Sequence, residues 1–93
     1  MLNDNPVLAF LGKRGRGAVV EALRRNSPRA LHVRELARLA DVAPMVASRA
    51  IQEMRRFDAV WVERVGREVR VRLDPHTRAG AYLASVDAPD PPY

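Results

Sequence analysis

The spacing of apolar residues in the middle of the chain predicts two short helices. Between residues 33 and 56 the apolar positions recur every three or four residues, interrupted only at residues 41–44, "DVAP". Ala47, Ile51 and Met54 form the inner face of the second helix, and Pro44 suits its first turn. Two helices joined by a tight turn, the second one amphipathic and basic, have the outline of a helix-turn-helix.

The period changes from helical to alternating after residue 59. Residues 60–65, "VWVERV", and 68–73, "EVRVRL", alternate apolar and polar positions, which is typical of half-buried strands. The dipeptide "GR" at 66–67 separates them, so we expect a hairpin with a tight turn. Val69, Val71 and Leu73 should face the core, and Trp61 should anchor the base of the hairpin there.

Further helices are expected on both sides of this central region. Asn5 and Pro6 suit a helix start, and apolar positions continue to about residue 25, as one interrupted helix or as a short helix followed by a longer one. Asp74 as cap and Pro75 as first residue predict a last helix. Residues 87–93, "DAPDPPY", are acidic and proline-rich and are expected to be disordered, which leaves residues 1–86 as one domain.

Charge is concentrated in the region that holds these motifs. The chain carries a formal net charge of +5, but residues 13–72 hold 15 of the 16 cations and 7 of the 11 acids, a local charge of +8. Such an excess favours a polyanionic partner. The absence of cysteine excludes disulfides and thiolate metal sites. The apolar run at residues 7–11 is too short to cross a bilayer, so no membrane association and a cytoplasmic, nucleoid-associated location are expected.

The basic stretch "GKRGRG" at residues 12–17 has three interpretations. A nucleotide-binding phosphate loop is rejected, since no strand precedes it and no Lys-Ser/Thr pair follows the last glycine. A minor-groove arm is disfavoured because a helix follows directly and no proline is present. The favoured interpretation is a loosely wound helix start, with Lys13, Arg14 and Arg16 available for DNA phosphates.

The order of these elements resembles a known family. Residues 32–73, "HVRELARLADVAPMVASRAIQEMRRFDAVWVERVGREVRVRL", are similar to the winged helix-turn-helix transcriptional regulators of bacteria, of the arsenic-repressor-like and MarR-like groups. The resemblance extends upstream to about residue 10. It implies a mainly α fold with a small β-hairpin (α+β), a motif at 33–56, a wing at 60–73 and flanking helices. Two departures are Asp41, where the family usually has glycine, and Ala43, where it commonly has a Ser or Thr cap.

The resemblance also implies double-stranded DNA as partner. The recognition helix 44–56 would enter the major groove, and residues 64–67 of the wing would meet the minor groove or the backbone. Arg49 can make a forked contact to guanine and Gln52 to adenine, while Met45 and Val46 suit thymine methyls. Arg55 and Arg56 would contact phosphates or complement the helix dipole. The full set of candidate DNA-binding residues is Pro44, Met45, Val46, Ser48, Arg49, Gln52, Arg55, Arg56, Arg64, Arg67, Lys13, Arg14 and Arg16.

A homodimer is expected, with an inverted repeat as its DNA site. The apolar faces of the flanking helices supply its candidate surface: Leu8, Leu11, Tyr82 and Leu83. No cofactor, metal site or catalytic residue is predicted, because His32 and His76 lie far apart and no carboxylate pair accompanies either at metal-ligand spacing. A small-molecule effector is left open. Two alternative functions also stay open: a winged helix that binds proteins, and a sequence-nonspecific architectural protein.

Overall fold

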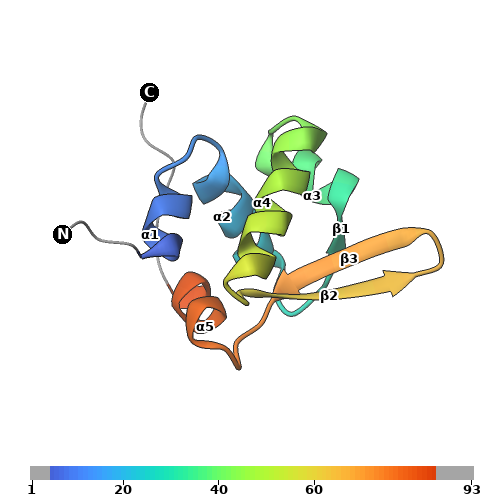
Figure 1. Cartoon of the computed structure of the whole chain (residues 1–93). Helices are drawn as coiled ribbons and strands as arrows, with labels where there is room; N and C mark the ends of the chain where they lie inside the picture. Colours follow the sequence, from blue (N-terminus) through green and yellow to red (C-terminus); the bar gives the residue numbers. More distant parts are fainter. Residues whose placement is uncertain (1–4, 86–93) are drawn as a thin grey trace.

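The computed structural model describes residues 5–85 and places a three-stranded sheet at one end of a group of helices (Figure 1). This architecture confirms the predicted class, mainly α with a small β-hairpin. The elements in chain order are α1 (Pro6–Leu11), α2 (Arg16–Asn26), β1 (Leu31–His32), α3 (Val33–Ala40), α4 (Pro44–Arg56), β2 (Val60–Val65), β3 (Glu68–Leu73) and α5 (Arg78–Ser85). Residues 87–93, which were expected to be disordered, lie outside the described residues.

The sheet has the strand order β1-β3-β2, with both pairings antiparallel. The hairpin pairs Val62 with Val71, and Val71 pairs in turn with Leu31 of β1. Strand β1 was not predicted, because two residues are too few to show a period. It leads directly into α3, so the wing and the helix-turn-helix are tied together through the sheet.

The core lies between α2, α3, α4 and the inner face of the sheet. Leu23, Leu36, Met54 and Val71 are fully buried there, one from each of these elements. Apolar side chains at helical spacing therefore meet the alternating side chains of the hairpin. This packing fixes which face of α4 turns inward.

The turn between α3 and α4 forms despite its two departures from the family pattern. Asp41 adopts the left-handed conformation (φ 56°, ψ 49°) in which glycine is the usual residue. Ala43 precedes α4 with extended backbone and provides no side-chain cap, and Pro44 occupies the first turn. At the other end of α3, Nδ1 of His32 accepts a hydrogen bond from the Glu35 amide at 3.4 Å, so His32 caps that helix.

Helix α5 begins at Arg78, three residues later than predicted. Asp74 and Pro75 belong instead to a turn, in which Oδ1 of Asp74 accepts a hydrogen bond from the His76 amide at 3.0 Å. Thr77 is the actual cap, since its Oγ1 accepts from the Gly80 amide at 3.0 Å. Gly80 is buried where α5 crosses the base of the hairpin, and a Cβ there would overlap the carbonyl oxygen of Asp74. A residue without a side chain is required at this crossing.

Candidate nucleic-acid interface

The outer face of α4 carries a row of exposed side chains, one apolar and three polar or charged. Met45, Arg49, Gln52 and Arg56 are all exposed and are spaced by four, three and four residues, which aligns them on one side of a helix. The opposite side carries the buried residues Ala47, Ala50, Ile51 and Met54. We refer to these four exposed residues as the recognition stripe. Met45, at its N-terminal end, is 63% exposed.

The other predicted contacts on α4 lie beside this stripe. Pro44 and Arg55 are exposed and Ser48 is half-buried. Val46 lies on another side of the helix, facing the connection between α1 and α2. A Cβ built on Gly15 would be 3.2 Å from Cγ1 of Val46. Val46 is therefore half-buried under that connection, away from the outer face of α4 where the predicted contact to a thymine methyl would require it.

The stretch "GKRGRG" forms the connection between α1 and α2, and only its last two residues, Arg16 and Gly17, belong to α2, so the favoured interpretation as a helix start holds for its end alone. Two of its cations are engaged within the chain. Nζ of Lys13 donates to Oε2 of Glu53 at 2.9 Å, and Nε of Arg16 donates to Oε1 at 2.9 Å. Arg16 is only 8% exposed, so the expectation that it is available for phosphates is wrong. Arg14 is exposed. No signal in the sequence points to Glu53, because its partners lie 37 and 40 positions away and no local pattern links them.

This cluster holds Glu53 in its ionised form. Hydrogen bonding from Arg16 is the main cause, and hydrogen bonding from Lys13 together with the positive charge of both groups adds to it, while partial burial opposes it. The pKa of Glu53 is lowered to about 2 as a result. The cluster therefore persists throughout the neutral range, and it joins the start of α2 to the C-terminal half of α4.

The wing carries its cations near the tip. Arg64 and Arg67 are exposed on either side of Gly66, which has a φ of 62° and permits the tight turn. Arg67 also lines a hollow of about 450 Å³ shared with His32 and Arg34. Trp61 does not anchor the core as predicted. It is 37% exposed on the outer face of the hairpin, with the Arg72 guanidinium 4.6 Å from its ring centre.

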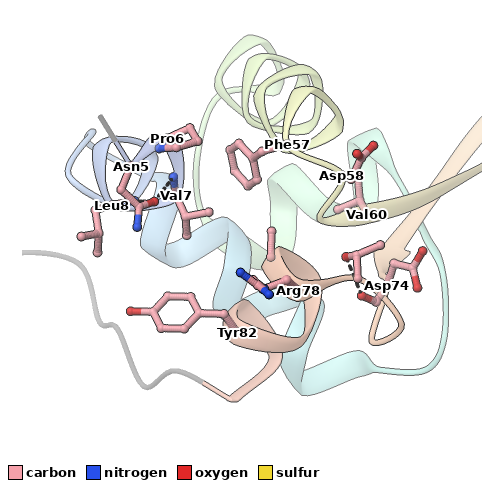
Figure 2. Close-up of a pocket in the computed structure, with 12 residues that line it drawn as sticks. Asn5, Pro6, Val7, Leu8, Phe57, Asp58, Val60, Asp74, Arg78 and Tyr82 are labelled. Atoms are coloured by element: carbon pink, nitrogen blue, oxygen red, sulfur yellow. Dashed lines mark hydrogen bonds between the residues drawn. The ribbon is translucent and has the colours of Figure 1, made fainter. Parts of the chain in front are cut away.

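The flanking helices leave an apolar groove between them (Figure 2). It has a volume of about 790 Å³, and its walls include Leu8 of α1 and Tyr82 of α5, which are 48% and 43% exposed. Leu11 is half-buried against the core. Leu83 is fully buried within this chain, so its assignment to a dimer surface is wrong. The helical period placed Leu83 beside Tyr82 but could not show which side of α5 the core would cover.

Neither a cluster of metal-ligating side chains nor a membrane-spanning helix lies within residues 5–85. No group of three or more histidine and acidic residues in this part of the chain could hold a metal ion. None of the helices there is long and apolar enough to cross a membrane.

The fold is similar to that of a known regulator. The chain superimposes on the crystal structure of MepR, described as a transcription regulator of the Staphylococcus aureus multidrug efflux pump MepA, with a TM-score of 0.62 and 15% sequence identity. The match covers 75% of this chain and 50% of MepR, so the chain spans about half the length of that protein. No protein-family model matches the sequence, and no curated protein sequence matches it either. The similarity confirms the winged-helix fold.

Proposed function

We propose that the chain binds double-stranded DNA in a sequence-specific manner and regulates transcription, with α4 in the major groove. The observation that carries this proposal is the recognition stripe. Its side chains can read base edges and lie together on one accessible face of α4, while the opposite face of the same helix is buried in the core. The fold similarity to MepR, a transcription regulator, supports the same function.

The chemistry of the stripe suits base recognition. The guanidinium of Arg49 matches the two acceptors of guanine, and the amide of Gln52 matches the donor and acceptor of adenine. Met45 offers a thioether and methyl group for the methyl of thymine. Arg56, at the end of the helix, would contact a phosphate. Each forked contact to the right base is worth roughly 1–3 kcal/mol of discrimination.

The wing supplies the second part of the proposed interface. Arg64 and Arg67 would contact the minor groove or the backbone beside the site read by α4. These contacts would set the position of the protein along the duplex, while the stripe would select the sequence.

The active unit that we propose is a homodimer. Leu8 and Tyr82 expose apolar surface on both sides of the groove between α1 and α5. This groove lies at the end of the molecule away from the hairpin tip (Figures 1 and 2). A second copy covering this surface would remove it from water. A two-fold dimer would then read an inverted repeat with half-sites about one helical turn apart.

The base-reading role of α4 is tested with Arg49→Ala. Duplexes are first selected from a random library with the wild-type protein, and affinity is then measured by fluorescence anisotropy. We expect Arg49→Ala to weaken binding to the selected duplex by roughly 5- to 150-fold and to relax the preference for guanine at one position of each half-site.

The matched control is Arg25→Ala, which removes the same charge from the far end of α2, where Arg25 is paired with Glu21. This variant should keep the sequence preference of the wild type. If Arg49→Ala and Arg25→Ala gave the same affinity and the same selected sequence, α4 would not be reading bases.

A further inference from the structure

On one flank of α4, a single carboxylate engages two of the three cations of residues 12–17. Besides its bonds from Lys13 Nζ and Arg16 Nε, Glu53 accepts a third from Arg16 Nη2 at 3.3 Å. Glu53 follows Gln52 directly on α4, so the cluster adjoins the recognition stripe. We call Lys13, Arg16 and Glu53 the clamp.

We propose that Glu53 is a positioning residue that sets DNA specificity, by withholding Lys13 and Arg16 from the DNA backbone and leaving Arg14 as the phosphate-binding cation of residues 12–17. This inference rests on the proposed DNA-binding function. It reverses the expectation from sequence that all three cations contact phosphates.

The geometry places these cations where released side chains would reach DNA. The connection between α1 and α2 lies beside the N-terminal half of α4 (Figure 1), and Gly15 packs against Val46 in the first turn of that helix. The same turn carries Met45 of the recognition stripe. A helix lying in the major groove has a phosphate strand on each side, so a cation at this flank is within side-chain reach of one of them.

The clamp also fixes the backbone from which the Arg14 side chain projects. Gly15 has a φ of 82°, and Nη1 of Arg16 donates to the Arg14 carbonyl oxygen at 3.4 Å. The backbone on the C-terminal side of Arg14 is therefore held against α4, while its side chain remains exposed.

The consequence for binding is electrostatic. Cations that contact phosphates release counterions, and each contact adds about 0.9 to the slope of log affinity against log salt concentration. This contribution is the same for every sequence, so it strengthens nonspecific binding. Pairing both cations with Glu53 lowers that contribution and makes discrimination depend more on the recognition stripe.

The test compares Glu53→Gln with Glu21→Gln. Both variants raise the net charge by one. Glu21 is paired with Arg24 and Arg25, and it lies roughly 140° around α2 from Arg16. Affinity for a scrambled duplex and for a duplex selected with the wild type is measured by fluorescence anisotropy over a salt series.

For Glu53→Gln we expect tighter binding to the scrambled duplex, a salt slope steeper by about 0.9 to 1.8, and a smaller ratio of selected to scrambled affinity. Adding Lys13→Ala to Glu53→Gln should make the salt slope shallower again by about 0.9. Glu21→Gln should leave the slope unchanged. An unchanged slope in Glu53→Gln, or an equal increase in both variants, would overturn the proposal.

Single alanine variants keep the test decisive if Glu53→Gln fails to fold. Lys13→Ala should leave the salt slope of the wild-type protein unchanged, whereas Arg14→Ala should reduce it by about 0.9. A reduction in Lys13→Ala equal to that in Arg14→Ala would overturn the proposal. The slopes on scrambled DNA are informative even if library selection yields no preferred sequence, the outcome that would count against the proposed function itself.

Discussion

Replacing Gly80 with alanine tests the packing of α5 against the hairpin base. A Cβ at this position would overlap the Asp74 carbonyl oxygen and would lie 2.7 Å from the Ala59 carbonyl oxygen. Ordinary contact begins at 3.4 Å, so the backbone must move by at least 0.7 Å at Ala59 and by more at Asp74. Such overpacking costs roughly 1–3 kcal/mol.

Two other terms modify that cost. The Asp74 amide donates to the Ala59 carbonyl at 2.9 Å, and straining this hydrogen bond adds about 1 kcal/mol. The higher helix propensity of alanine stabilises α5 by about 1 kcal/mol relative to glycine, which offsets the cost of straining that hydrogen bond. We therefore expect Gly80→Ala to lower the free energy of unfolding by about 2 kcal/mol. It should also weaken the proposed dimer, because Tyr82 moves with α5.

Urea unfolding followed by circular dichroism measures the change. Gly12→Ala is the matched control, since Gly12 has a φ of −75° and a Cβ there would have no neighbour closer than 3.5 Å. The control should stay within about 0.5 kcal/mol of the wild type. Equal stability of Gly80→Ala and Gly12→Ala would refute the packing described for α5.

Three further predictions concern stability. Asp41→Gly should raise the free energy of unfolding by up to about 1 kcal/mol, because Asp41 has a φ of 56°; a loss of stability in urea would contradict this. Ala43→Ser should add about 1 kcal/mol by supplying the missing cap of α4, and an unchanged melting temperature would count against it. The pKa of Glu53 is about 2 in the folded chain against an ordinary value of 4.5. The contribution of Glu53 to the free energy of unfolding is therefore fully present above about pH 4.5 and is lost as the pH falls through 2. With Glu53 still 23% exposed, this amounts to about 1–2 kcal/mol. In urea titrations at pH 7 and pH 3, the free energy of unfolding of Glu53→Gln should therefore fall less between the two pH values than that of the wild type. An identical fall in the two proteins would contradict the clamp.

The periodic elements could be predicted because their signal is local. Helical spacing over residues 33–56 and alternation over residues 60–73 each reflect one buried face, and the structure has α3, α4 and the hairpin there. Strand β1 was missed because its two residues pair with β3, about 40 positions away along the chain. The predicted start of α5 was wrong because Asp74 and Thr77 both suit a helix cap. Only the packing of Gly80 on the hairpin base decides between them.

The candidate site was predictable to a similar extent. The buried face of α4 follows from its spacing, so the exposed positions of Arg49 and Gln52 follow too. Whether Arg16 and Leu83 are buried or exposed depends on tertiary contacts, which composition and spacing do not reveal. Trp61 also shows this limit. Its size suggests burial, but the register with Arg72 places it on the outer face of the hairpin.

One comparison of affinities decides whether the chain binds DNA in a sequence-specific manner. The wild-type protein is titrated at physiological salt with the duplex selected from a random library and with a scrambled duplex of equal length and composition. The proposal predicts at least about a thousandfold preference for the selected duplex. Equal affinity for the two duplexes, falling steeply with salt, would contradict it and identify a sequence-nonspecific binder.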